Sequence, residues 1–427
     1  MSSAPLSRRR FLQACAGCGV ALAASRALPL AGLVPSARRL AWLPGLAGPP
    51  PARAVERTDG LLRDAPVARW WASTTQAGAA CATCHTSAEL AAPAASSGAH
   101  HRHDTLVKCL LCARGCGLKE GERGECGARL VKDGRLLSLT YGRPVAVHVD
   151  PIEKKPFYHF LPGALAYSFG TAGCPLHCEF CQNWELSQSR PEDHAGPFVP
   201  PADLVAAARA SGAPIVAFTY DEPTVFAEYL IDVARAARQA GLRPVLVSCG
   251  IMNEAPLAEM CDVLDAIKID LKGYSPEFYR KVSHAELAPV LRSIRQVAGR
   301  GVHLEIVNLV VPTLNDSEAM LQGLAGWLVD TVGPDVPVHF TRFHPDYRLQ
   351  NLPPTPVETL ERARAIALAK GLRYVYVGNV PGHSGNNTWC PRCGALVIRR
   401  SGFLIEEMGA QDGKCARCGA PIAGVWS

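Results

Sequence analysis

The chain has 427 residues, of which 48% are hydrophobic and 19% charged, so it is long enough to bury a sizeable core. Its formal charge of +6 comes from residues 1–60, which hold eight Arg against Glu56 and Asp59, and the rest of the chain is neutral. Because binding to nucleic-acid phosphates needs a basic excess in the folded part, this distribution argues against a DNA- or RNA-binding protein.

Residues 1–34 have the layout of an export leader. The segment SRRRFLQ at 7–13 precedes an apolar, Ala- and Gly-rich run and resembles the twin-arginine signal of proteins that fold before export. Arg26 interrupts the run, so we expect no transmembrane domain beyond this leader. The alternative is a disordered basic leader. Cys15 and Cys18 lie inside it and are excluded from any site.

Residues 35–104 are rich in Ala, Pro, Gly and Ser and predict a linker. Within them, CATCH (Cys81, Cys84 and His85) matches the attachment signature of c-type haem. No apolar helical surround accompanies it, so a haem is not expected, and an idle Cys pair or an accessory metal site is favoured.

A four-cysteine module is predicted over residues 105–150. The chain has 17 cysteines, and all but Cys249 and Cys261 stand in close-spaced groups, which in a long chain favours metal over disulfides. This module supplies the thiols of CLLCARGCGLKEGERGEC, a closed set that suits a structural zinc or an auxiliary cluster: Cys109, Cys112, Cys116 and Cys126. Spacing alone does not distinguish a zinc ion from an iron–sulfur cluster.

Residues 151–384 alternate short apolar runs with amphipathic helices. The runs start near positions 165, 214, 244, 266, 303 and 336, and helical periodicity separates them. This alternation predicts an α/β fold with a parallel sheet wrapped by helices, either a full or partial barrel or a doubly wound sheet.

Polar residues follow the predicted strands at the points where each strand ends. In a parallel barrel all these ends meet on one face, where loops build the active site. The candidates are Tyr220, Glu222, Ser248, Asp270, Lys272, Asn308 and His344.

Three further thiols follow the first strand, at a C-x3-C-x2-C spacing: Cys174, Cys178 and Cys181. Thiolates favour zinc or iron–sulfur clusters, and each iron of a [4Fe–4S] cube needs one outside ligand. Three protein ligands leave one iron open, and the amino nitrogen and carboxylate of S-adenosylmethionine (SAM) can occupy it. One electron passed to the sulfonium then breaks a C–S bond and gives a 5′-deoxyadenosyl radical.

The segment CPLHCEFC, with Phe180 before the last Cys, resembles the hallmark of the radical SAM superfamily. The resemblance implies a partial (β/α)6 TIM-like barrel, with a cluster on the three thiols and SAM bound beside Phe180, Tyr220, Ser248 and Asn308. It implies that Glu222 receives the amino group of SAM, although Tyr220 and Asp221 replace the two glycines of that motif. Asp270, Lys272 and His344 resemble groups of glycyl-radical-enzyme activases that contact SAM or a substrate peptide.

Residues 105–427 are further similar to the AmmeMemoRadiSam-system radical enzymes, relatives of the pyruvate formate-lyase activases. The similarity lies in YGRPVAVHVDPIEKKPFYHFLPG, CEFCQNWELSQ, TRFHPDYRLQNLPPTPVETLERAR and YVYVGNVPGH. It implies Memo-like and AMMECR-like proteins as partners and a reductant such as flavodoxin or ferredoxin, and it assigns no substrate.

Residues 385–427 predict a zinc ribbon. CPRCG and CARCG are knuckles whose glycines permit the tight turn that aims the thiolates inward. We therefore expect Zn²⁺ on Cys390, Cys393, Cys415 and Cys418, with a rubredoxin-like iron as the alternative.

Three functions follow from these patterns. The leading one is a radical SAM enzyme that abstracts hydrogen from a protein or small molecule. The second is an exported electron-transfer protein with several Fe–S centres and, as an option, a haem at CATCH. The third, a zinc-rich scaffold, leaves the three-thiol loop unexplained. The radical chemistry indicates the cytoplasm, whereas the leader indicates the periplasm.

Overall fold

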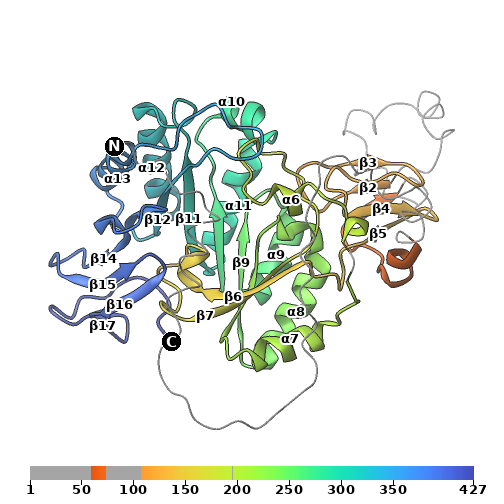
Figure 1. The fold of residues 1–427 in the computed structure, drawn as a ribbon, viewed down its shortest axis with the longest axis horizontal. Helices are drawn as coiled ribbons and strands as arrows, with labels where there is room; N and C mark the ends of the chain where they lie inside the picture. Colours follow the sequence, from red (N-terminus) through yellow and green to blue (C-terminus); the bar gives the residue numbers. More distant parts are fainter. Residues whose placement is uncertain (1–58, 74–106, 195) are drawn as a thin grey trace, which may run out of the picture. The chain divides into compact units, whose positions relative to one another are not determined.

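A mixed sheet of eight strands forms the centre of the described fold (Figure 1). The structure is a computed structural model that describes residues 59–73, 107–194 and 196–427. The chain divides into residues 1–50 and residues 51–427, and everything described below lies in the second part. The predicted leader, CATCH and most of the predicted linker lie outside the described residues.

The sheet has the order β13-β12-β11-β10-β9-β8-β7-β6. Its strands β7 to β13 are parallel, and β6 pairs antiparallel with β7 at one edge. The strands are β6 (Ala146–Pro151), β7 (Leu165–Gly170), β8 (Ile215–Phe218), β9 (Arg243–Ser248), β10 (Ala266–Asp270), β11 (His303–Val310), β12 (Val338–Arg342) and β13 (Val375–Gly378). The predicted α/β fold is confirmed; the strand ladder is open, and its curvature into a partial barrel stays a prediction.

Helices connect the parallel strands, as right-handed β-α-β crossovers require. The longer ones are α7 (Pro201–Ala210), α8 (Ala227–Gln239), α9 (Glu254–Val263), α11 (Leu287–Gly299), α12 (Glu318–Val332) and α13 (Val357–Ala369). Short turns of helix lie in the loops: η2 (Ile152–Lys154), α6 (Trp184–Ser187), η3 (Pro191–Asp193), η4 (Pro223–Phe226), α10 (Pro276–Phe278), η5 (Tyr279–Ser283) and η6 (Ser384–Asn386). None of the described helices is long and apolar enough to cross a membrane.

The two faces of the sheet bury different partners, because side chains alternate along each strand. Val216 and Phe218 of β8 join the apolar cluster that includes the helices. Ile215 and Ala217 face the other way and pack in a separate cluster with Phe157 and Phe160. The helices therefore cover one face, and the segment after β6 fills part of the other.

The four-cysteine module consists of small antiparallel sheets. They are β1 (Trp71–Ser73) with β2 (Val107–Cys109) and β3 (Gly117–Leu118), and the hairpin of β4 (Arg129–Lys132) and β5 (Arg135–Ser138). The predicted boundary at residue 150 lies too late, since β6 already belongs to the central sheet.

Part of the predicted linker is folded, which corrects the sequence interpretation. Residues 71–73 form β1, and Trp70 is buried and donates its indole N–H to Glu259 at 3.2 Å. The Arg69 guanidinium binds Asp232 of α8 at 2.8 Å. An Ala-rich composition did not reveal this segment because the partners that bury it come from α8 and α9, far along the chain.

The C-terminal module is also antiparallel. It consists of β14 (Thr388–Trp389), β15 (Leu396–Ser401) and β16 (Leu404–Met408), followed by the pair β17 (Ala410–Gln411) and β18 (Lys414–Cys415). It packs on the central domain through Tyr158, Tyr374 and Tyr376, which share an apolar cluster with Val397 and Ile398.

Candidate radical SAM site

Polar and thiol groups gather at the carboxyl edge of the sheet, as predicted. The thiol loop follows β7, Glu222 follows β8, and Ser248 and Asp270 are the last residues of β9 and β10. Because these strands are parallel and adjacent, their ends meet at one edge.

The thiol loop is held firmly at its middle residue, Glu179. The backbone N–H of Glu179 donates to the Val282 carbonyl at 3.0 Å, and the Glu179 carbonyl accepts from Arg348 and Leu349 at 3.0 and 2.9 Å. A His284 ring nitrogen lies 3.3 Å from the Glu179 carboxylate. Segments from η5 and from the turn after β12 thus position the loop.

The three thiols are mostly shielded from solvent. Cys174 and Cys178 are buried and Cys181 is half-buried. The Leu176 N–H donates to Cys174 Sγ at 3.4 Å, and Ser187 Oγ lies 3.3 Å from Cys181 Sγ. Burial raises the pKa of the Cys174 thiol well above its usual range, so bonding to a metal is what would keep it as a thiolate.

The three loop thiols are spaced more widely than the ligands of a single ion. Among the described residues, groups of three or more ligand atoms within 4.8 Å of one another are found at Cys390, Cys393, Cys415 and Cys418, and not in the loop. Four sulfurs about 2.3 Å from one zinc lie about 3.8 Å apart. Irons at separate corners of a cube hold their ligands further apart, so the wider spacing is compatible with the [4Fe–4S] cluster that the superfamily implies.

Glu222 is buried, and its carboxylate binds four protein donors. Oε1 accepts from the Thr224 N–H at 3.2 Å, from Thr224 Oγ1 at 2.5 Å and from Ser248 Oγ at 2.7 Å. Oε2 accepts from the Cys249 N–H at 2.5 Å. These bonds join the loops after β8 and β9, and because only one of them ends on Oε2, that oxygen keeps a second acceptor site. Receipt of the SAM amino group, the role predicted for Glu222, stays a prediction.

Tyr220 and Asp221 stand where the superfamily motif has glycines. Tyr220 has a φ of 79°, a left-handed conformation that favours glycine. Its hydroxyl donates to Asp150 at 3.3 Å, and the Lys155 ammonium lies 4.4 Å from its ring centroid. Asp221 accepts from Thr171 Oγ1 at 3.0 Å, its Oδ1 has no partner among the described residues, and burial raises its pKa well above its usual range.

Asp270 and Lys272 form an ion pair beside the thiol loop. Asp270 accepts from Lys272 Nζ at 3.4 Å and from Lys268 Nζ. Burial alone would raise the pKa of Asp270, but Lys268 and Lys272 outweigh it and hold the pKa below its usual range. Burial would lower the pKa of Lys272, but Cys249, Asp270 and Cys178 outweigh it and raise that pKa, so Lys272 stays cationic.

Three other predicted residues differ in their surroundings. Phe180 is buried, stacks on Phe278 at 6.3 Å and lies 5.7 Å from Lys272 Nζ. Asn308 is buried and donates to the Leu271 carbonyl at 2.7 Å, while its Oδ1 has no partner among the described residues. His344 is exposed, in the segment that follows β12.

Cys249 lies at the same edge of the sheet, although it was not among the candidate site residues. Its backbone N–H donates to Glu222 Oε2 at 2.5 Å, and it stands alone in the sequence. Its position directly after β9 was the signal available, because that is where the other site residues stand.

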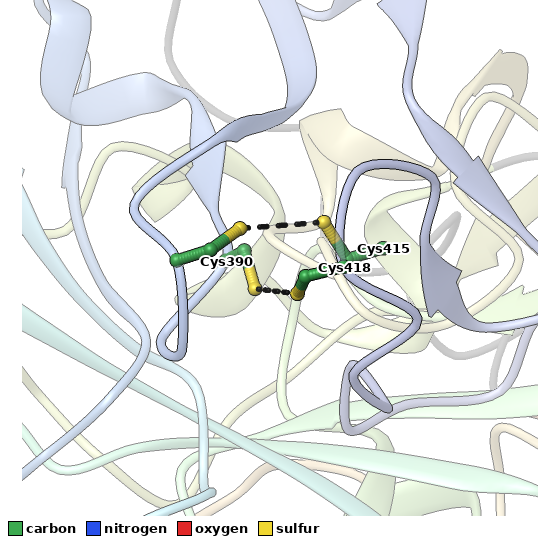
Figure 2. A group of neighbouring side chains, drawn as sticks. Cys390, Cys415 and Cys418 are labelled. Carbon is green, nitrogen blue, oxygen red and sulfur yellow. Dashed lines mark hydrogen bonds between the residues drawn. The ribbon is translucent and has the colours of Figure 1, made fainter.

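The C-terminal thiols form the second predicted group (Figure 2). Cys390 Sγ lies 3.7 Å from Cys418 Sγ, and Cys393 Sγ lies 3.8 Å from Cys415 Sγ. Gly394 and Gly419 have φ values of 66° and 69°, which confirms the glycine-dependent turns. This group of four thiols can bind one tetrahedral metal ion.

Comparison with known proteins identifies the family. The radical SAM superfamily model matches residues 169–322, which include the thiol loop and the ends of β8 to β10. Residues 169–322 form a radical SAM superfamily domain. An uncharacterized protein of Methanocaldococcus jannaschii is 41% identical over 321 residues, covering 75% of this chain and 96% of that protein.

More distant radical SAM proteins are also similar. The pyruvate formate-lyase-activating enzyme of Listeria monocytogenes is 24% identical over 34% of this chain, and the match spans 61% of that enzyme's length. A domain of the pyruvate-formate lyase-activating enzyme from Bacteroides vulgatus matches 38% of this chain and 98% of its own, with 19% identity and a TM-score of 0.35. Streptococcus suis SuiB bound to S-adenosylmethionine matches 53% of each chain, with 10% identity and a TM-score of 0.41.

Proposed function

We propose that this radical SAM protein is an enzyme that binds a [4Fe–4S] cluster on Cys174, Cys178 and Cys181 and cleaves SAM reductively. The observation that carries the proposal is the three-thiol loop at the carboxyl edge of the sheet, with Lys272 beside it. When bound, the cluster supplies one electron to the SAM sulfonium, giving methionine and a 5′-deoxyadenosyl radical that takes a hydrogen atom from substrate.

The chain's own residues position and shield SAM. The Lys272 ammonium pairs with Asp270 and offers a cation to the SAM carboxylate. Glu222 acts as a positioning residue, because its four hydrogen bonds hold the loops after β8 and β9 together. Phe180 and Phe278 keep water from the inner side of the thiol loop.

The substrate is proposed only as a class. Similarity to a pyruvate formate-lyase-activating enzyme favours a glycyl-radical-activase-like reaction on a protein partner, with flavodoxin or ferredoxin as the electron donor. Association with Memo-like and AMMECR-like proteins stays a prediction. So does the assignment of zinc to the C-terminal group of four thiols.

The test replaces one cluster thiol. Cys174→Ala leaves too few ligands, so 5′-deoxyadenosine production by the anaerobically reconstituted, reduced protein should fall at least about a hundredfold, a barrier increase of about 3 kcal/mol. Cys261→Ala is the matched control, because Cys261 is a buried thiol on α9 outside every thiol group. Continued SAM cleavage by the Cys174 variant would disprove the cluster assignment.

An electron-transfer protein is the second candidate. It accounts for several thiol groups but not for the charged pair of Asp270 and Lys272 at the site. The test uses reduced wild-type protein. An EPR spectrum that does not change when SAM is added, together with no formation of 5′-deoxyadenosine, would favour this candidate over the enzyme.

A further inference from the structure

The four upstream thiols line one partly open cavity: Cys109, Cys112, Cys116 and Cys126. A Cβ on Gly124 would lie 3.7 Å from Cys126 Sγ and 3.8 Å from Cys116 Sγ, so the lack of a side chain at Gly124 leaves both sulfurs room. Three thiols that precede β3 and one thiol that precedes β4 therefore line the same cavity.

Their spacing differs from that of the C-terminal group. Within the described ranges, no three of these sulfurs lie within 4.8 Å of one another, whereas the sulfurs of Cys390, Cys393, Cys415 and Cys418 do. The same chain thus contains one set of four thiols at the spacing of a single tetrahedral ion and one set whose sulfurs are spaced more widely.

A buried cation also lines the cavity. Arg129 is 1% exposed, and its Nη2 donates to Glu228 at 2.6 Å. Its Nε and Nη1 have no hydrogen-bond partner among the described residues. Leaving two buried N–H groups unpaired is unfavourable, so they point to an acceptor that the described residues do not supply. Sulfide and thiolate sulfurs of an anionic cluster would be such acceptors.

The module is docked rigidly against the radical SAM site. Arg114 Nε donates to the Pro175 carbonyl at 2.8 Å, one residue after Cys174. The Ala113 N–H donates to the Ile251 carbonyl at 3.0 Å, in the loop after β9. Pro175 and Thr224 also line the cavity, so its wall is shared with the loops after β7 and β8.

We propose that Cys109, Cys112, Cys116 and Cys126 hold a second [4Fe–4S] cluster whose four irons are all ligated by the protein. Such a cluster has no open iron and does not bind SAM. The inference goes beyond the proposed function and does not rest on it, because it concerns iron and sulfide content and not SAM cleavage.

The decisive variant removes the other cluster site. Full-length protein carrying Cys174→Ala, Cys178→Ala and Cys181→Ala is reconstituted anaerobically with iron and sulfide. We expect about four irons and four sulfides per chain, against about eight of each in the wild type. The reduced variant should give a cluster EPR signal that SAM does not change, and it should form no 5′-deoxyadenosine.

Two further variants in that background locate the cluster. Adding Cys112→Ser and Cys116→Ser should remove the remaining iron and sulfide, whereas adding Cys261→Ala should leave both unchanged. A folded triple variant, judged by gel filtration and thermal unfolding, that holds no sulfide-bound iron would overturn the proposal. Zinc that is present in the triple variant and is lost when Cys112→Ser and Cys116→Ser are added would also overturn the proposal, because it would identify a zinc site.

Discussion

At the scale of single residues, Lys272 joins the thiol loop to the sheet. It pairs with Asp270, lies over the Phe180 ring and interacts with Cys178 and Cys249. Lys272→Met should therefore weaken SAM binding about tenfold or more, since it removes a cation worth about 1.4 kcal/mol or more to the SAM carboxylate. The measurement is a SAM titration followed by EPR of the reduced cluster.

Lys268→Met is the matched control for Lys272→Met. Lys268 also pairs with Asp270, but it lies within β10 and not beside the thiols. If both substitutions weakened SAM binding equally, the effect would come from Asp270 losing a partner, and Lys272 would have no direct role.

The site residues differ in how far the sequence could reveal them. Cys174, Cys178 and Cys181 were predictable because their spacing is local, and Asp270 and Lys272 because they follow a strand. The four donors on Glu222 depend on how the loops after β8 and β9 meet, which no local pattern encodes.

At the scale of elements, the thiol loop and the four-cysteine module meet at Gly173. Gly173 has a φ of 99°, and a Cβ there would lie 2.2 Å from the Cys126 carbonyl oxygen. Gly173→Ala should lower the free energy of unfolding by about 3 kcal/mol or more, because it adds a backbone clash to the strain of a left-handed alanine. Urea unfolding measures the loss.

Gly212→Ala separates the two causes. Gly212 has a φ of 76° with no atom within 4 Å of an added Cβ, so its substitution brings the strain alone, about 1 kcal/mol. Equal losses for both variants would show that the contact between Gly173 and Cys126 does not matter to stability.

The C-terminal module is expected to depend on a metal at its four thiols, since it consists of one short three-stranded sheet and one β-pair. Cys415→Ser should remove about one metal ion per chain and abolish hydrogen-exchange protection of β15 and β16, while β8 stays protected. Elemental analysis identifies the metal. Unchanged protection of β15 without the metal would show that packing on Tyr374 and Tyr376 is sufficient.

At the scale of the whole molecule, the sequence predicted the α/β layers because periodicity and strand-end chemistry are local. It did not predict that residues 66–73 fold onto α8, or that Cys249 donates to Glu222. Both depend on contacts between distant segments, such as the backbone N–H of Arg69 donating to Glu228 at 3.0 Å. A segment whose sequence has no helical or strand periodicity gives no sign of such distant contacts, so only the folded structure shows them.

The central domain and the C-terminal module are joined by a buried histidine. His159 Nδ1 donates to the Ala423 carbonyl, and Nε2 accepts from the Tyr376 hydroxyl at 2.5 Å. These partners favour the neutral ring, and burial lowers the pKa of His159 from 6.5 to about 4. Between these values the unfolded chain binds more protons than the folded chain, so stability is full above pH 6.5 and falls as the pH drops toward 4.

His159→Gln should remove this dependence. Acidification through the window should destabilise the wild type by about 3 kcal/mol more than the variant, although the variant is less stable at every pH because it loses packing on Tyr374. Urea unfolding at neutral pH and at the lower end of the window gives, for each protein, the change in the free energy of unfolding with pH. His148→Gln, at an exposed position of β6, is the control. Equal changes for wild type and His159→Gln would mean that protonation of His159 does not loosen the contact between the modules.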